Sequence, residues 1–297
     1  AIKDNDKNLV EKLIKDGADV SVVDTNGASL LMWAVMYSDL DMVKKLVNLK
    51  ANINAKGIIY TNPEKTTYYG SLLAIATATN KLDILKYLIE KQGLNVNECE
   101  INSQDKTQTG WTPLYYAVSN SNIETIKYLI SKGADVNLCC SADKFNATLL
   151  AFSKSNLETC KLLLSKGADI MLTDTSQTTI ISQAAINTNV EVLKLAVSKY
   201  KQAINKPDIN GLYPISYAVY FSLIENLKIL LNNGAKYDIV SNNGETLLHL
   251  AARSKSLEMI DEVLKVYPES INKQNTYGTT ALIIAALKQD NEVVEHL

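Results

Sequence analysis

Apolar residues recur at helical spacing in two short runs within residues 110–137. One run falls on one face of a short helix, and the second falls on one face of another helix: Leu114, Ala117 and Val118, then Ile123, Ile126, Leu129 and Ile130. Thr112 can cap the first helix and Pro113 suits its first position. Gly133 can end the second helix in the left-handed conformation. The pattern predicts a helix, a tight turn, a second helix and a short connection.

The same pattern repeats along the chain. An acidic residue opens each second helix, at Asp41, Asp83, Glu124, Glu158, Glu191, Glu225, Glu258 and Glu292. Successive members lie 33 or 34 residues apart from Glu124 onward and 41 or 42 residues apart before it. An alanine keeps the same register in the first helices, at Ala34, Ala76, Ala117, Ala151, Ala184, Ala218, Ala251 and Ala285. The chain is therefore a tandem array, with insertions in its first part.

The unit resembles an ankyrin repeat, whose signature is T-P-L-H-x-A on a 33-residue period. Thr112, Pro113, Leu114 and Ala117 match that signature, and Tyr115 stands at the histidine position. Second helices end at Gly-Ala-Asp or a near relative, at Gly17, Gly133, Gly167 and Gly234. The resemblance covers essentially the whole chain. It implies an all-α ankyrin-repeat solenoid of helix-turn-helix units with short β-turn or hairpin fingers, in which His249 bonds turn backbone between repeats.

The resemblance implies a single array over residues 1–297 with about nine repeats. The boundaries are 1–23 (partial), 24–55, 56–97 and 98–137 (both with a long finger), 138–173, 174–207, 208–240, 241–274 and 275–297 (partial). Helices this short are unstable alone in water, so each repeat must be covered by its neighbours. An apolar edge at Val293, Val294 and Leu297 predicts that the chain is trimmed or continues.

Two insertions are candidates for function. Residues 56–69 add about eight residues to the repeat norm and residues 98–109 add about seven, both in the turn between repeats. Repeat insertions often lie on the binding face, although surface loops also tolerate length at small cost in free energy. Three tyrosines of the first insertion are candidate binding residues: Tyr60, Tyr68 and Tyr69.

The resemblance also implies a concave groove lined by finger tips and by late positions of the first helices. The candidate partner-binding residues there are Asn26, Met36, Tyr37, Trp111, Asn120, Lys154, Leu212, Tyr220, Arg253 and Tyr277. Aromatic residues and arginine dominate interface hot spots. We expect Trp111 and Tyr220 to be exposed, Phe145 and Phe221 not to be, and Trp33, Tyr116 and Tyr217 to lie within the stack.

Composition and charge exclude little. The formal net charge of −2 gives no reason to expect nucleic-acid binding or an anionic membrane. No apolar run approaches the ~20 residues of a membrane helix. The four cysteines, at positions 99, 139, 140 and 160, have no framework spacing, so we expect reduced thiols and a cytoplasmic location.

The sequence shows no pattern of residues typical of a catalytic or metal-binding site. The chain has two histidines, and no Cys or His pair has zinc-ligand spacing. We therefore expect no enzyme, no metal and no cofactor, but a monomeric module that docks a protein or an extended peptide. The alternatives are a structural spacer or regulatory segment of a larger protein and, more remotely, a small-molecule or enzyme site in the finger cleft.

Overall fold

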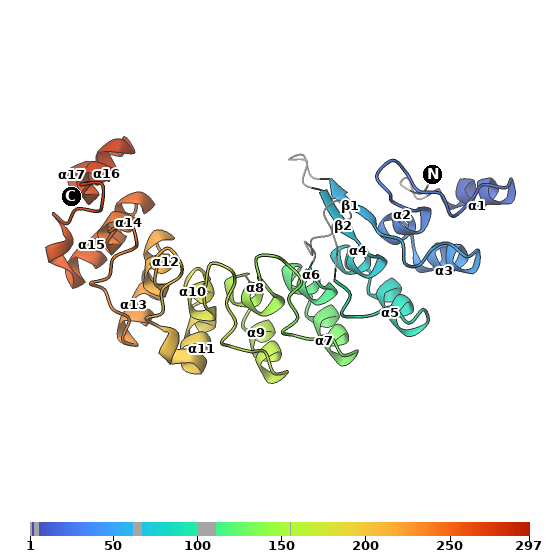
Figure 1. Cartoon of the computed structure of the whole chain (residues 1–297), viewed down its shortest axis with the longest axis horizontal. Coiled ribbons are helices and arrows are strands. Elements are labelled where there is room, and N and C mark those ends of the chain that lie inside the picture. Colours follow the sequence, from blue (N-terminus) through green and yellow to red (C-terminus); the bar gives the residue numbers. More distant parts are fainter. Residues whose placement is uncertain (1, 3–5, 62–66, 100–110, 155) are drawn as a thin grey trace. The chain divides into compact units, whose positions relative to one another are not determined.

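The computed structural model describes the chain except for residues 1, 3–5, 62–66, 100–110 and 155 (Figure 1). Side chains within residues 58–69 also lie outside the description. The chain divides into two compact units, residues 1–147 and residues 148–297. Each unit is built from consecutive helix pairs, as the repeat pattern predicts. The prediction of an all-α array of helix pairs is confirmed.

The first unit contains seven helices and one hairpin among its described residues. Its elements are α1 (Lys7–Lys15), α2 (Leu30–Tyr37), α3 (Leu40–Asn48), β1 (Gly57–Thr61), β2 (Thr67–Gly70), α4 (Leu72–Ala78), α5 (Leu82–Glu90), α6 (Pro113–Ser119) and α7 (Ile123–Ser131). The two strands pair antiparallel, with Gly57 opposite Gly70. The first insertion thus includes both strands of a hairpin finger.

The second unit contains helix pairs with two added 3-10 turns. Its elements are α8 (Ala147–Lys154), α9 (Leu157–Ser165), α10 (Ile180–Ala185), α11 (Val190–Tyr200), η1 (Lys201–Ala203), α12 (Pro214–Tyr220), α13 (Ile224–Asn232), α14 (Leu247–Ser254), α15 (Leu257–Val266), η2 (Pro268–Ser270), α16 (Ala281–Leu287) and α17 (Asn291–His296). Within this unit α10, α12, α14 and α16 pack in sequence, and α11, α13, α15 and α17 form the second row (Figure 1).

Caps and left-handed residues delimit these short helices. The Thr112 hydroxyl accepts the N–H of Tyr115 at 3.1 Å, and Pro113 occupies the first turn of α6. Gly133 follows α7 with φ +88°, a conformation that glycine adopts without strain. Gly167 and Gly234 have φ +84° and +95° after α9 and α13. Local sequence chemistry therefore sets where the helices begin and end.

Alanines form the contact line between neighbouring first helices. The eight alanines in register, from Ala34 to Ala285, are all 0% exposed. Within the units, α4 packs between α2 and α6, and α14 packs between α12 and α16. A side chain of one carbon allows such helices to approach closely, and larger apolar residues fill the space around the line. The core is thus spread along each unit rather than gathered at one centre.

Polar side chains connect one repeat to the next. Asn97 Nδ2 donates to Gly133 O at 3.0 Å, and Asn97 Oδ1 accepts the N–H of Asp135 at 2.8 Å. Asn205 makes the same pair of bonds to its following repeat, at 2.9 and 2.8 Å. These amides satisfy backbone groups at the ends of second helices, where no helical partner exists.

His249 is buried and joins two repeats of the second unit. Its Nδ1 accepts the backbone N–H of Thr246 at 3.1 Å, and its Nε2 lies 2.8 Å from the carbonyl oxygen of Thr279. These partners require a neutral ring with the proton on Nε2, because a backbone N–H can only donate and a carbonyl can only accept. The residue is 0% exposed.

Replacing His249 by alanine should lower the free energy of unfolding by about 2–4 kcal/mol, because the change leaves a cavity and removes partners from two backbone groups. Denaturant unfolding of the whole chain measures this loss. His296→Ala, at an exposed pair with Asp261, is the control and should cost less than about 1 kcal/mol. Equal losses for the two variants would contradict the structural role of His249.

Finger turns of the second unit are joined by backbone hydrogen bonds. Ile209 N donates to Ser176 O at 3.0 Å, and Asn242 N donates to Asn210 O at 2.9 Å. Gly211 lies within this ladder with φ +74°, and a Cβ there would stand 2.7 Å from the nitrogen of Asn242. The position requires glycine both for its backbone conformation and for the close approach of the next finger.

Gly211→Ala should therefore destabilise the protein more than Gly278→Ala. Gly278 has φ +70° but nothing within 4 Å of a built Cβ, so its variant carries only the left-handed strain of about 1–2 kcal/mol. Gly211→Ala adds an overpacking cost of about 1–3 kcal/mol. Denaturant midpoints of the two variants measure the difference, and a larger loss at Gly278 would contradict the tight finger ladder.

Candidate functional site

One column of side chains faces away from the alanine contact line in the second unit. Tyr220, Arg253 and Leu287 each lie two residues after a fully buried alanine, which is about 200° around the helix. Tyr220 is 49% exposed and Leu287 is 75% exposed. Since α12, α14 and α16 pack side by side, these three positions come from adjacent repeats. The column is the start of a groove between the helices and the finger turns.

A pocket of about 450 Å³ lies at the α12–α14 part of this groove. It is lined by Asn210, Leu212, Ser216, Tyr217, Tyr220, Phe221, Ser241, Asn243, Glu245, Leu250 and Arg253. The predicted residues Leu212, Tyr220 and Arg253 are thus brought together in one cavity. Its volume is within the range of small-ligand sites and is large enough for an aromatic side chain.

The wall formed by Tyr217 is fixed in place. Its hydroxyl donates to Asp208 Oδ2 at 2.7 Å. Burial and this hydrogen bond to the carboxylate raise the pKa of Tyr217 far above its ordinary value. Asp208 Oδ1 also accepts the N–H groups of Asn210 and Leu212, each at 2.8 Å. One buried carboxylate therefore positions both the tyrosine and the turn that carries Leu212.

The pair Glu245–Arg253 stands at the edge of the pocket. Arg253 Nη2 hydrogen-bonds Glu245 Oε1, and the two side chains are 34% and 14% exposed. Glu245 N in turn donates to Ser241 Oγ at 3.2 Å. The ion pair holds the guanidinium at the boundary with a second, smaller pocket.

That second pocket measures about 240 Å³ and shares Arg253. Its other lining residues are Asn275, Tyr277, Thr279, Ile284, Leu287 and Lys288. Tyr277 is 77% exposed. Asn275 Oδ1 accepts the N–H groups of Tyr277 and Thr279, each at 3.0 Å, and so holds the finger tip in shape. The predicted residues Arg253 and Tyr277 meet here.

Two aromatic rings, Tyr220 and Phe221, are exposed at the end of α12, whereas the sequence predicts exposure for Tyr220 alone. The predicted exposure of Tyr220 is confirmed, but the expectation that Phe221 is covered is wrong, since it is 52% exposed. The two rings meet edge to face, with centroids 5.2 Å apart. Phe221 follows the last helical residue, so its ring packs on Tyr220 instead of turning into the stack.

Predicted residues of the first unit lie in several places. Asn26 and Tyr37 are exposed, Met36 is half-buried, and Tyr37 stacks on Trp33 with centroids 5.7 Å apart. Trp33 Nε1 donates to Asp24 Oδ2 at 3.0 Å, in the same nine-residue relation as Tyr217 and Asp208 in the second unit. The side chains of Tyr60, Tyr68 and Tyr69 lie outside the described residues.

Trp111 is half-buried, so the expectation that it is exposed is wrong. Its ring stacks on Tyr115 with centroids 4.6 Å apart and meets Tyr116 edge to face. Tyr115 stands at the family's histidine position and is 9% exposed. An aromatic ring at this position gives the tryptophan a surface to stack on.

Asn120 and Lys154 are exposed but differ in their contacts. Asn120 Nδ2 donates to the carbonyl oxygens of Thr77 and Ala78, at 3.2 and 3.0 Å. This amide thus bridges two repeats. Lys154 ends α8 and lies outside the two pockets. Four other rings are half-buried, as the sequence predicts for rings that are not exposed: Phe145, Trp33, Tyr116 and Tyr217.

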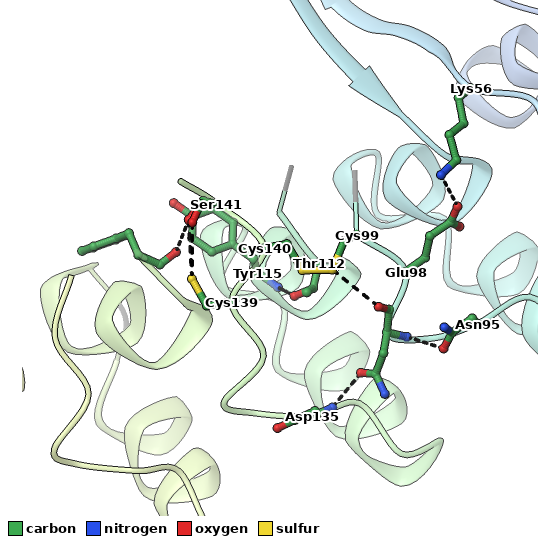
Figure 2. The surroundings of a disulfide bond; sticks show 12 residues. Lys56, Asn95, Glu98, Cys99, Thr112, Tyr115, Asp135, Cys139, Cys140 and Ser141 are labelled. Carbon is green, nitrogen blue, oxygen red and sulfur yellow. Dashed lines mark hydrogen bonds and ion pairs between the residues drawn. A yellow bond between two sulfur atoms is a disulfide. The ribbon is translucent and has the colours of Figure 1, made fainter. Parts of the chain in front are cut away.

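The expectation that all four cysteines are reduced thiols is wrong. Cys99 and Cys140 form a disulfide that joins the loops on either side of one repeat, as Figure 2 shows. They are 41 residues apart, and stacking of consecutive repeats brings their Cα atoms to 5.7 Å. Cys139 and Cys160 are free thiols. Disulfides persist in oxidising compartments, so the argument for a cytoplasmic location no longer holds.

Other contacts support the loop that carries the disulfide. Lys56 Nζ pairs with Glu98 at 3.0 Å, which connects the base of the hairpin finger to the residue before Cys99 (Figure 2). Asn97 is held by the next repeat through the two bonds described above. By contrast, burial raises the pKa of the Cys160 thiol to about 12, so that thiol is unreactive at neutral pH.

The described residues hold no cluster of three or more His, Cys, Asp or Glu side chains that could bind a metal ion. Among the described helices, none is long and apolar enough to span a membrane.

Comparison with known proteins establishes the family. The model for ankyrin repeats (three copies) matches residues 1–98, 55–140, 73–174, 149–241 and 236–297, which together cover the chain. The chain therefore belongs to the ankyrin repeat family. Proteins of this family typically mediate protein–protein interaction and typically are not enzymes.

Three curated relatives show how the chain compares with longer proteins. It is 26% identical over 258 residues to the phosphocholine transferase AnkX of Legionella pneumophila, covering 85% of this chain and 24% of that protein. It is 28% identical to alpha-latroinsectotoxin-Lt1a of Latrodectus tredecimguttatus, and the match covers 100% of this chain and 21% of that protein. It is 24% identical to the putative ankyrin repeat protein L371 of Acanthamoeba polyphaga mimivirus, and the match covers 98% of this chain and 32% of that protein. The chain thus spans a fifth to a third of these relatives.

Reduction of the Cys99–Cys140 disulfide should lower the free energy of unfolding by about 2–4 kcal/mol, because the bond closes a long loop in the unfolded chain. Urea unfolding with and without a thiol reductant measures this. Thiol titration in denaturant should find two free cysteines before reduction and four after it.

Two variants serve as controls for this prediction. Cys139→Ser keeps the disulfide and should respond to reductant like the parent protein. Cys99→Ser lacks it and should not respond. Four free thiols in the unreduced parent protein would contradict the disulfide.

Proposed function

We propose that this ankyrin array docks a partner protein or an extended peptide on its concave groove and finger loops. The observation that carries the proposal is the pair of adjoining pockets in the second unit, with Arg253 at their shared edge. Buried hydrogen bonds and packed helices hold their walls before any partner arrives. A preformed surface loses little conformational entropy on binding.

The side chains in this groove are of the kind that interfaces use. Tyr220, Phe221 and Tyr277 expose aromatic surface, and Arg253 provides a planar cation at the boundary between the pockets. Tyrosine and arginine are enriched among residues that contribute most binding energy. Exposed apolar residues gathered at one place, rather than scattered, favour an interaction site.

Trp111, Tyr37 and Met36 are proposed as the partner-binding residues of the first unit, at the positions that correspond to the same groove. We propose no catalytic role for this segment and no cofactor. Neighbouring repeats within each unit stack on one another, and we propose that the chain acts as a monomer. A spacer or regulatory segment of a larger protein is the alternative, and it predicts no dependence on groove residues.

Affinity capture with the immobilised chain from a lysate of the source cell tests the proposal. Tyr220→Ala should weaken retention of a specific partner by about tenfold or more, because removing an interface anchor costs about 1.4 kcal/mol or more. Tyr237→Ala is the control, since Tyr237 is 43% exposed but lies outside both pockets. Trp111→Ala and Tyr37→Ala test the first unit in the same way.

A partner retained equally by the parent protein and by Tyr220→Ala, Trp111→Ala and Tyr37→Ala would contradict docking in the groove. Thermal unfolding of each variant, followed by circular dichroism, must remain close to that of the parent, so that lost binding reports the surface and not the fold.

A further inference from the structure

We propose that the groove of the second unit recognises an extended protein segment that carries a large apolar side chain and, about three positions away, an acidic side chain. This inference rests on the proposed docking function and gives its occupant a chemistry. It follows from the spacing of the two pockets, from their unlike linings and from the charges around the second one.

Spacing comes from the repeat geometry. Tyr220, Arg253 and Leu287 occupy equivalent positions on the neighbouring helices α12, α14 and α16. Packed helices lie about 8–10 Å apart. An extended chain advances about 3.3 Å per residue, so three residues span about 10 Å. A segment that crosses the helices can therefore place one side chain in each pocket.

The larger pocket suits an apolar side chain. Leu212, Leu250 and the rings of Tyr217, Tyr220 and Phe221 line it. The ring of Tyr217 is held by Asp208, and the rings of Tyr220 and Phe221 support each other edge to face. A large apolar or aromatic side chain would displace water from these surfaces and bury most of its own area, which is the main source of affinity at such sites.

The smaller pocket suits a carboxylate. Its charged lining residues are two cations, Arg253 and Lys288. Glu245 balances Arg253, so the exposed ammonium group of Lys288 leaves the groove with an excess positive charge. The nearby carboxylate of Asp290 is paired with Lys255 at 3.5 Å. An acidic side chain beside Lys288 and Arg253 would gain charge-assisted hydrogen bonds, whereas a basic one would be repelled.

The apolar rim supports the same orientation. Tyr277 and Leu287, both more than two-thirds exposed, flank the cations in the smaller pocket. The stem of the partner's acidic residue can pack on these side chains while its carboxylate reaches the ammonium group. The groove therefore distinguishes a segment with one acidic residue near an apolar anchor from a purely apolar or a basic segment.

Display of random dodecapeptides on phage, selected against the whole chain, tests the inference. Enriched sequences should combine an aromatic or large aliphatic residue with Asp or Glu about three positions away. A fluorescein-labelled synthetic peptide of the consensus sequence is then titrated by fluorescence polarisation. Lys288→Glu should weaken its binding by about tenfold or more, and selection against that variant should enrich Lys or Arg in place of the acid.

Lys265→Glu is the matched control. It makes the same charge change at an exposed lysine of α15 that lines neither pocket, and it should leave the titration within about twofold of the parent. Binding of the peptide should also weaken as salt is raised. Tyr220→Ala should abolish binding of both the acidic peptide and the basic peptides selected by Lys288→Glu.

The outcomes separate this inference from the proposed function. Peptides that depend on Tyr220 but lack an enriched acid, or that bind equally to the parent and to Lys288→Glu, would overturn the stated chemistry and leave docking in the groove intact. Enriched peptides whose binding is unaffected by Tyr220→Ala, or a complete failure of enrichment, would overturn both.

Discussion

Everything in this protein depends on contacts between neighbouring repeats. Its helices are mostly six to eleven residues long, a length at which an isolated helix is unstable in water. They persist because neighbouring first helices pack on one another within each unit, and the alanine that recurs in these helices is completely buried. Amides such as Asn97 and the ring of His249 add hydrogen bonds across the same boundaries. Stability is therefore a sum of interface terms rather than the property of one core.

The groove is a consequence of this packing. If one side of a first helix must present alanine to its neighbours, the side about 200° away is left for other contacts. Its residues are not needed to hold the stack, so they can vary from repeat to repeat: Tyr220, Arg253 and Leu287 in three successive repeats. The finger turns close the other side, and their backbone ladder holds Leu212 and Tyr277 in fixed positions. The surface is thus rigid where the scaffold requires it, and its side chains vary from repeat to repeat at these groove positions.

The disulfide also depends on the packing of neighbouring repeats. Cys99 and Cys140 are distant in the sequence, but they lie in the loops on either side of one repeat. The ion pair between Lys56 and Glu98 also connects the base of the hairpin β1–β2 to the loop that carries Cys99. The first unit thus supports its lengthened fingers by contacts that the regular repeats of the second unit do not have at corresponding places among the described residues.

The sequence by itself determined the repeat and the positions at which helices begin and end. Thr112 as a cap, Pro113 after it and Gly133 at a left-handed position are local chemistry, which a linear pattern contains in full. The periodic alanines likewise indicated which face is buried, because burial in an array is repeated in every unit. The family resemblance also predicted a partner-binding groove between the finger tips and the first helices, and its role in binding stays a prediction.

Only the tertiary structure decided how particular side chains meet. The exposure of Phe221, the stacking of Trp111 on Tyr115 and the disulfide between Cys99 and Cys140 depend on rotamers and on distances between adjacent repeats. Such distances are not encoded in the period, since the same spacing accommodates many packings. The meeting of Leu212, Tyr220 and Arg253 in one cavity is of this kind, because it requires a turn, a helix end and the next repeat to converge in space.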